Sequence, residues 1–354
     1  MGAVTGAVTG ASMAGLLMES EIAEQPARWA DQLGRDRGLR PIVDRIRAYG
    51  PRFVTFIARG TSDHAATYGR YAADVLCGLP GGSWSPSTTT LYGARPDLRG
   101  CLAVAISQSG GSPDLSASLV AAREGGALTL AITNDPASPL ATAAELHLDL
   151  QAGPELAVAA TKSFTAELLA LARLFLELSG TAEPALARLP EWGHAVLSDP
   201  AAAETIAATV DRFSGERTVL TGRGYSAAVA HEGALKLMET CYVSASGFSA
   251  ADLLHGPIAI LDPGVHAIAF TSEGPAGRAM LPIIDRIRSS GAPLLTIGGT
   301  TAGHDTVRLP EGVPELLAPL LQVLPVQAFA LSLARSRGLD PDAPRGLLKV
   351  TETR

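Results

Sequence analysis

The stretch Phe53-Val-Thr-Phe-Ile-Ala-Arg-Gly-Thr-Ser62 has a counterpart later in the chain, Arg217-Thr-Val-Leu-Thr-Gly-Arg-Gly-Tyr-Ser226. Each is a β-rich run that ends in Arg-Gly-x-Ser. Each is followed by an alanine-rich segment that we expect to be helical, 63–76 in the first case and 227–238 in the second. Self-similarity of this kind is the signature of a duplicated unit, and it organises everything that follows.

The spacing stays in step beyond the two stretches. The number of residues from Gly60 to the apolar run at Cys101 equals the number from Gly224 to the apolar run at Val265. The numbers of residues to the next apolar runs, at Ala127 and at Ala292, agree to within one. Each half therefore indicates strand, helix, strand, helix, strand. Continuous Val, Ile, Leu and Ala runs separated by helices are typical of a parallel sheet buried on both faces. We predict an α/β fold made of two tandem doubly wound domains.

The repeat also sets the expected boundaries. We expect an N-terminal leader and helix over residues 1–36 and a first domain over 37–195. A second domain is expected over 196–339 and a C-terminal tail over 340–354. Outside the repeated strands we expect a helix over 17–33 that is broken at Pro26, and a second helix over 163–178. A linker or helical hairpin is expected over 184–200 and a last helix over 314–335.

Composition narrows the class of protein. The chain has 354 residues, 47% hydrophobic and 18% charged, which suits two globular domains. A net charge of −7 without a basic run argues against a nucleic-acid partner. Residues 1–13 lack the basic start of a signal peptide, and no run of about 20 apolar residues predicts a membrane span. The three cysteines have no metal-ligand spacing and suggest reduced core residues of a cytoplasmic protein.

The densest polar turn is Ile106-Ser-Gln-Ser-Gly-Gly-Ser-Pro-Asp-Leu115, between a buried strand and a helix. Hydroxyls and free backbone N–H groups at a helix N-terminus form a ready anion site, and Pro113 fits the first helical turn. A plain Ser-capped helix start is the alternative. The turn Arg59-Gly-Thr-Ser62 favours the anion site, because ligands of open α/β sheets bind at the carboxyl ends of strands, where both turns fall.

A dinucleotide-binding site is a further alternative for the glycines of the second repeat. Gly222-x-Gly224-x-x-Ala227 matches the loose dinucleotide fingerprint, but no acidic residue follows at the expected distance, and the repeat explains the glycines as a fold turn. No Walker A pattern and no metal-binding motif is present. We therefore expect no cofactor and no metal.

The segment His231-Glu-Gly-Ala-Leu-Lys-Leu-Met-Glu239 carries a second group of polar residues. Glu232, Lys236 and Glu239 share one helix face. A solvated face with an ordinary Glu–Lys pair is the alternative. Because this helix is otherwise apolar and starts at the second repeat's turn, we expect the charges to point into a site, where a carboxylate beside an ammonium can move protons. His255 stands before Gly-Pro at a turn, and His64 and His231 could simply be helix-surface residues.

At these residues the sequence resembles the isomerase half of glucosamine-6-phosphate synthase and the stand-alone glucosamine-6-phosphate deaminases, which are built on two flavodoxin-like SIS (sugar isomerase) domains. The resemblance spans nearly the whole chain, through the ordered motifs Met18-Glu-Ser-Glu-Ile-Ala-Glu-Gln-Pro26, Arg-Gly-Thr-Ser, Ser-Gln-Ser-Gly, Ala159-Ala-Thr-Lys-Ser-Phe164, Glu-Gly-Ala-Leu-Lys-Leu, Leu-His-Gly-Pro and Pro344-Arg-Gly-Leu-Leu-Lys349.

The resemblance implies a role for each matching position. The phosphate and sugar hydroxyls would be bound by Gly60, Thr61, Ser62, Ser107, Gln108, Ser109, Ser112 and Val158. Glu239 would be the base that moves a proton between C2 and C1, with Lys236 assisting beside it. His255, which in the family reaches into the neighbouring subunit's site, would open the sugar ring, and Lys349 would meet the open-chain carbonyl. A homodimer with shared active sites is implied.

Two positions depart from the family pattern. Ala160 stands where many relatives have Ser, and the tail has Arg-Gly-Leu-Leu-Lys where Arg-Asn-Leu-Ala-Lys is usual. Both bear on sugar specificity. The chain has Gly2 where the synthase has its N-terminal Cys, so the expected reaction is the hydrolytic one, amino sugar phosphate plus water giving ketose phosphate plus ammonia. A fructosamine-phosphate deglycase, a ketose/aldose isomerase and a non-catalytic sugar-phosphate sensor stay open.

Overall fold

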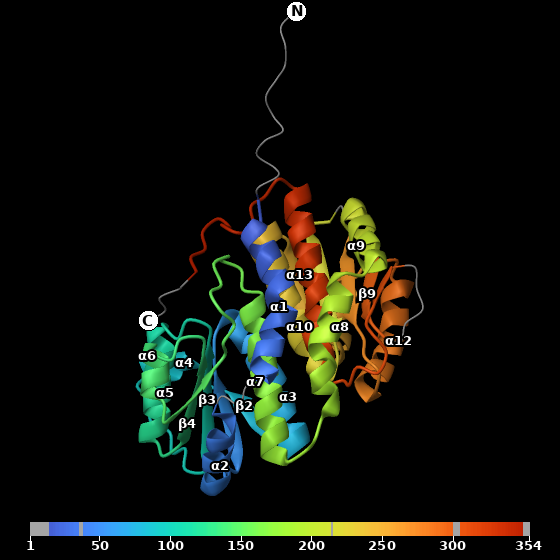
Figure 1. Cartoon of the computed structure of the whole chain (residues 1–354). Helices are drawn as coiled ribbons and strands as arrows, with labels where there is room; N and C mark the ends of the chain where they lie inside the picture. The colour runs from blue at the N-terminus through green and yellow to red at the C-terminus, as the bar shows by residue number, and fades with distance from the viewer. Residues whose placement is uncertain (1–13, 35–37, 214, 300–304, 350–354) are drawn as a thin grey trace, which may run out of the picture.

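A computed structural model describes residues 14–34, 38–213, 215–299 and 305–349, and all structural statements below refer to these ranges. The expected leader, 1–13, and the last five residues of the expected tail lie outside them. Two five-stranded sheets stand on opposite sides of the molecule with helices between and outside them (Figure 1).

The first sheet is entirely parallel, with strand order β2-β1-β3-β4-β5. Its strands are β1 Phe53–Ile57, β2 Gly81–Ser83, β3 Cys101–Ser107, β4 Leu128–Thr133 and β5 Leu146–Asp149. The second sheet is parallel too, with order β7-β6-β8-β9-β10 when followed from its other edge. Its strands are β6 Arg217–Gly222, β7 Ser244–Ser249, β8 His266–Phe270, β9 Leu294–Gly298 and β10 Thr306–Arg308.

The two orders are the same when the strands of each half are numbered along the chain. This is the flavodoxin-like order, so the prediction of two tandem doubly wound domains is confirmed. The sequence indicated three strands in each half, and the structure has five in each. The four strands that were missed, β2, β5, β7 and β10, are the edge strands of the two sheets.

Helices fill the spaces around both sheets. The α-helices are α1 Leu16–Leu33, α2 Leu39–Tyr49, α3 Gly60–Cys77, α4 Pro86–Thr90, α5 Pro113–Glu124, α6 Pro139–Ala143, α7 Lys162–Ser179, α8 Leu189–Leu197, α9 Pro200–Arg212, α10 Ala227–Cys241, α11 Ala250–Leu254, α12 Pro275–Ser289 and α13 Ala318–Ser336. Short 3-10 turns are η1 Pro184–Arg188, η2 Gly224–Ser226 and η3 Pro257–Ile260. The stretch expected as a linker or hairpin holds η1 and α8, with α9 beginning at its end.

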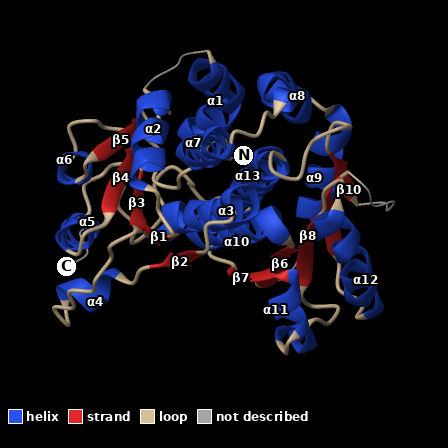
Figure 2. Cartoon of the chain, turned by 90° about the horizontal axis from the view of Figure 1, so that it is seen from below, coloured by secondary structure: helices blue, strands red, loops and turns tan. Residues whose placement is uncertain are grey.

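Each sheet has one face of small residues and one of large ones, because side chains alternate along a strand. In β3, Cys101, Ala103 and Ala105 face the outer helices α5 and α6, whereas Leu102, Val104 and Ile106 face the centre. The same division appears in β8, where alanines meet the outer helices and Ile268 and Phe270 face the centre. The two large faces share one core, filled by α3, α7, α10 and α13 between the sheets (Figure 2).

Two glycines at equivalent places in the repeat allow the central helices to lie close. A Cβ on Gly69 of α3 would be 2.9 Å from the Phe56 ring, and one on Gly233 of α10 would be 2.7 Å from Leu220 and 2.8 Å from Val326. Both glycines therefore let a helix rest directly on the first strand of its own domain.

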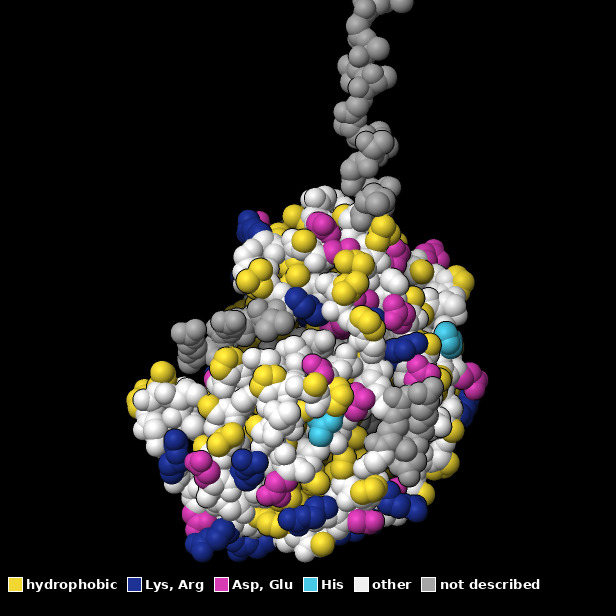
Figure 3. Space-filling model, turned by 60° about the vertical axis from the view of Figure 1, so that its left-hand side comes forward, with side chains coloured by type: hydrophobic (Ala, Val, Ile, Leu, Met, Phe, Trp, Pro, Cys, Tyr) yellow, Lys and Arg dark blue, Asp and Glu magenta, His cyan; other side chains and the backbone are white. Residues whose placement is uncertain are grey.

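Helix α13 is long and apolar enough to cross a membrane by length and composition, but 83% of its most apolar window is buried inside the protein. It packs against α10, α9, α8 and α1, as a core helix does. On the face shown in Figure 3, the acidic and basic side chains among the coloured residues are interspersed rather than gathered into one basic stripe.

The expected break of the first helix at Pro26 is wrong. Helix α1 runs without interruption past this proline. Proline cannot donate to the carbonyl of Ile22, but the side-chain Nε2 of Gln25 donates to that carbonyl at 3.1 Å. Gln25 also donates to Gln327 of α13 at 2.7 Å, so the replacement donor is itself fixed in the core.

Candidate active site

A cavity of about 210 Å³ opens at the carboxyl ends of β1 and β3. In the strand order of the first sheet, these are the two strands between which the chain reverses direction, the usual ligand site of such sheets. The cavity is lined by the turn after β1, the turn after β3, the loop before α7, one side chain of α10 and the C-terminal tail. One pocket therefore combines parts of both domains.

Two hydroxyl-bearing turns form one side of the cavity. Its lining includes the sequence-predicted residues Thr61, Ser62, Ser107, Gln108, Ser109, Ser112 and Val158. Gly60, also predicted, is the first residue of α3 and lies between two lining residues. The hydroxyl-rich turns that the sequence singled out thus meet at one place in space.

The turn after β3 is shaped to receive an anion. Ser107 Oγ and Ser109 Oγ accept backbone N–H groups of Gly110 at 3.1 Å and Gly111 at 3.3 Å. Gly110 has a φ of 63°, and a Cβ there would lie 2.2 Å from Ser138 Oγ, so only glycine fits. Ser112 stands at the N-cap of α5 without using its hydroxyl to cap the helix. That hydroxyl and the helix N-terminus remain available to a ligand.

An ion pair joins the two turns. Arg59 donates from both Nε and Nη2 to one carboxylate oxygen of Asp114, at 3.1 and 3.0 Å. Asp114 is 2% exposed in the first turn of α5, and Arg59 precedes α3. The pair was not predicted from the sequence, although it explains why an arginine precedes the glycine of the first turn.

The equivalent turn of the second domain is already filled by the protein itself. Glu315 Oε1 accepts from Ser272 Oγ at 3.0 Å and from the backbone N–H groups of Ala276 and Gly277 at 2.8 and 3.1 Å. These donors stand at the start of α12, where α5 starts in the first domain. A carboxylate therefore occupies the anion position of the second repeat, and the open position is in the first.

Helix α10 carries three linked charged groups, one of which reaches the cavity. Lys236 Nζ lies 3.2 Å from Glu232 Oε1 and 2.6 Å from Glu239 Oε2. Lys236 and Glu232 are fully buried, whereas Glu239 is 21% exposed and lines the cavity. Burial alone would lower the pKa of Lys236, but the two carboxylates raise it above its ordinary value. Lys236 is therefore a fixed cation that supports the one carboxylate reaching the cavity.

The network extends to the first domain. Thr61 Oγ1 donates to Glu232 Oε1 at 3.1 Å, and Lys236 Nζ donates to the same hydroxyl at 3.4 Å. His64 Nδ1 lies 2.8 Å from Glu232 Oε2. The sequence placed Glu232, Lys236 and Glu239 on one face, which the structure shows, but it gave His64 no partner.

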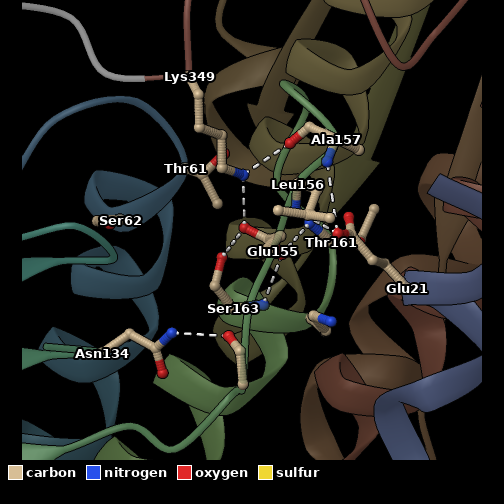
Figure 4. Close-up of polar contacts among 12 residues, drawn as sticks. Glu21, Thr61, Ser62, Asn134, Glu155, Leu156, Ala157, Thr161, Ser163 and Lys349 are labelled. Carbon is tan, nitrogen blue, oxygen red and sulfur yellow. Dashed lines mark hydrogen bonds and ion pairs between the residues drawn. The ribbon is translucent and has the colours of Figure 1, made fainter. Parts of the chain in front are cut away.

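The tail brings Lys349 to a buried carboxylate, Glu155 (Figure 4). Lys349 Nζ donates to Glu155 Oε2 at 2.9 Å and to the carbonyl of Ala157 at 2.7 Å. Glu155 also accepts from the N–H groups of Thr161 and Ser163 at 3.0 and 2.9 Å and from the Ser163 hydroxyl at 2.7 Å. Burial would raise the pKa of Glu155, but Lys349 and these donors lower it below the ordinary value.

Glu155 is the main residue of the site that sequence reasoning missed. Its one signal is that it is the single charged residue of the stretch 150–160. A second buried acid, Glu167, accepts from Ser62 Oγ at 2.7 Å. Burial raises the pKa of Glu167 well above its ordinary value, and the nearby carboxylates Glu155 and Glu232 add to the rise. Glu167 thus lies beneath the first turn and is joined to it by the Ser62 hydroxyl.

The remaining predicted residue, His255, is not in this cavity. It ends α11 on the surface of the second domain and is exposed. Ala160, where the sequence departs from the family pattern, does line the cavity, as do Leu347 and Leu348 of the tail. Within the described ranges no group of three or more His, Cys, Asp or Glu side chains could hold a metal ion.

Comparison with known proteins fits this arrangement. The SIS domain model matches residues 50–177 and 213–334, one match for each half. Glutamine–fructose-6-phosphate aminotransferase (isomerizing) of Thermococcus kodakarensis is 35% identical over 353 residues, which cover 94% of this chain and 57% of that protein. The same enzyme of Mycobacterium tuberculosis is 37% identical over 365 residues, with 94% and 57% covered. The chain thus spans little more than half the length of these relatives.

Solved structures agree. A protein from Silicibacter pomeroyi described as a phosphosugar isomerase superposes with a TM-score of 0.82 at 36% identity, covering 92% of this chain and 99% of that one. Glucosamine-6-phosphate deaminase of Thermotoga maritima shares the fold, with a TM-score of 0.75 at 19% identity and 95% and 100% covered. The chain belongs to the SIS domain family of phosphosugar isomerases, with two SIS repeats homologous to the isomerase half of the aminotransferase.

Proposed function

We propose that the protein is an amino sugar phosphate deaminase and isomerase that converts glucosamine 6-phosphate and water to fructose 6-phosphate and ammonia. The observation that carries the proposal is the single cavity in which an anion-binding turn, a carboxylate backed by a buried lysine and a second lysine on the tail come together. Phosphate would bind at the turn after β3, which leaves the sugar's first carbons toward Glu239 and Lys349.

The proposed chemistry is proton transfer followed by hydrolysis. After ring opening, Glu239 removes the proton from C2 and returns it to C1, while O1 gains a proton and the nitrogen gives one up. The product of this step is a C2 imine. Water adds to C2, the C–N bond breaks, and ammonia leaves with the ketose phosphate. Lys349 lies where an ammonium can polarise the open-chain carbonyl, or where a free amine can form an imine with it.

Mass action supports the hydrolytic direction. Water is far more abundant in solution than free ammonia, so a site that exchanges nitrogen with solution favours release of ammonia.

We also propose that the protein works as a homodimer. His255 is exposed and outside the cavity of its own chain, which suits a residue that completes the partner's site. Two inactive variants, His255→Ala and Lys349→Ala, would then regain part of the activity when mixed, because one of the two sites in a mixed dimer carries both native residues. No recovery, with exchange of subunits shown independently, would contradict sharing.

Turnover of purified protein tests the activity. Glucosamine 6-phosphate should yield ammonia and fructose 6-phosphate in equal amounts. Glu239→Gln should abolish turnover and leave binding of the sugar phosphate nearly intact, whereas Glu204→Gln on the exposed face of α9 should change neither. Tight binding without ammonia would favour a sensor, and ketose–aldose conversion without ammonia would favour a simple isomerase.

A further inference from the structure

A continuous line of charged groups runs from a partly exposed imidazole to the proposed base. His64 of α3 is 20% exposed, and its Nδ1 lies 2.8 Å from Glu232 Oε2. Glu232 Oε1 lies 3.2 Å from Lys236 Nζ, which lies 2.6 Å from Glu239. Each step is within ion-pair distance, so the protonation of His64 is linked electrostatically to Glu239 further along the same face of α10.

The central member of this line depends on its partners. Glu232 is fully buried, and a buried carboxylate is costly unless it is paired. One of its oxygens accepts from Thr61 and Lys236, and the other faces only His64 among its hydrogen-bond partners in the described residues. With His64 neutral, Lys236 is shared between Glu232 and Glu239. With His64 charged, Glu232 is compensated without Lys236, whose charge then acts more fully on Glu239.

The two stacked imidazoles next to this line differ in their partners. His231 stacks on it at 5.8 Å between ring centroids. Burial lowers the pKa of His231, and the neighbouring charges of His64 and Arg70 lower it further, against Asp63 and Asp252. Helix α7, which packs against α3, carries Glu167, and burial raises the pKa of that carboxyl well above its ordinary value. Of the two stacked imidazoles, His64 is the one paired with a carboxylate.

We propose that His64 is a positioning residue that couples turnover to pH: when it gains a proton, the Lys236 ammonium is held more by Glu239, and that carboxylate becomes a weaker base. The inference rests on the proposed function and names a means by which that site is regulated. Glu239 remains the group that touches the substrate, and His64 acts on it only through Glu232 and Lys236.

Deuterium exchange into a sugar phosphate tests this coupling separately from ammonia release. Fructose 6-phosphate and the protein are incubated in D₂O, and loss of the C1 proton signal is followed by NMR between pH 5.5 and 8.5. Wild type should slow as the pH falls over this range, because His64 then pairs with Glu232 as a cation. His64→Gln keeps an N–H donor for Glu232 but no titrating charge. Its rate relative to wild type should rise by about tenfold from pH 8.5 to 5.5.

Two further variants control the comparison. His231→Gln, which changes the stacked neighbour that has no carboxylate partner, should follow the wild-type profile. In a Glu232→Gln background, adding His64→Gln should have no effect on the profile, because the link between His64 and Lys236 is already cut.

The outcomes separate the two claims. A ratio of His64→Gln to wild-type rate that stays constant with pH would overturn the role of His64 and leave the proposed function standing, since a purely structural residue lowers the rate at every pH. No exchange and no ammonia from wild type at any pH would refute the proposed function and this inference with it.

Discussion

The pair formed by Lys349 and Glu155 predicts a specific loss of stability when the carboxylate is removed. Glu155→Gln keeps the shape of the side chain but leaves one acceptor oxygen in place of two. The side chain accepts four hydrogen bonds, from two backbone amides, one hydroxyl and the Lys349 ammonium, and it is completely buried. Two of the four donors lose their acceptor.

The magnitude follows from those losses. A hydrogen bond to a charged group contributes about 1.5–3 kcal/mol, and a buried donor without a partner costs about 1–3 kcal/mol. Lys349 is 26% exposed, so water compensates part of its loss. We expect the free energy of unfolding to fall by about 2–3 kcal/mol and the tail to detach more readily. Turnover should fall with it, since Lys349 is no longer held beside the cavity.

Urea unfolding and limited trypsin digestion measure the two effects. Digestion should cut the variant faster after Arg345, a residue of the tail that stacks on Tyr242 while the tail is attached. Glu19→Gln is a matched control, because Glu19 pairs with Arg335 on the surface and should cost no more than about 1 kcal/mol. A Glu155→Gln protein within about 0.5 kcal/mol of wild type, with an unchanged rate of cutting, would refute the reasoning.

The same pair predicts a pH dependence. The folded state lowers the pKa of Glu155, so its contribution is complete above the ordinary value of 4.5 and is lost as the pH falls through the lowered value. The difference in stability between wild type and Glu155→Gln should therefore be largest near neutral pH and shrink in acid. A difference that grows below pH 4.5 would contradict this sign.

Three further substitutions test other parts of the structure. Glu167→Gln should stabilise the protein by an amount that grows with pH above 4.5, by up to about 1.4 kcal/mol per pH unit, because a raised pKa means that the folded state keeps a proton that the unfolded state releases. Urea unfolding at pH 5 and 7.5 measures the difference, and a variant less stable than wild type at pH 7.5 would count against the raised pKa of Glu167. Gly233→Ala should cost about 1–2 kcal/mol, since the new methyl meets Leu220 and the stiff Val326 below 3 Å; a more stable variant would show that the helices can separate freely. Glu315→Ala should lower the melting temperature, and inorganic phosphate should restore part of the loss by taking the carboxylate's place at the start of α12; melting curves with phosphate and with chloride compare the two.

Much of the fold could be predicted because its long strands and helices carry their own pattern. The short strands could not. β2 is Gly81–Ser83, and β7 reads Ser-Ala-Ser-Gly-Phe-Ser, so neither has the apolar run that marks a buried strand. Their pairing comes from the neighbouring strands. Pro26 misled the prediction for α1 because the donor that repairs the helix, Gln25, is locked in place by a residue about 300 positions away.

The candidate site divides in the same way. Hydroxyl-rich turns and the charged face of α10 are local patterns, and the sequence shows them directly. The contact between Glu155 and Lys349 joins residues 194 positions apart through the path of the tail, which no local pattern specifies. His64 is similar: its carboxylate partner lies on a helix of the other repeat, 168 positions away.

The C-terminal tail contacts the start of α1 as well as the candidate site. Asp342 accepts the N–H groups of Leu17 and Met18 at 3.0 and 2.8 Å and so caps the first turn of α1, whose own N-cap position offers no side-chain acceptor. The amides at the start of α1 are therefore satisfied by a residue more than 300 positions further along the chain. A nascent chain that ends after the first sheet has neither this acceptor nor α13, against which α1 packs. The final docking of α1 is thus a late event in translation, because it needs the last part of the described chain.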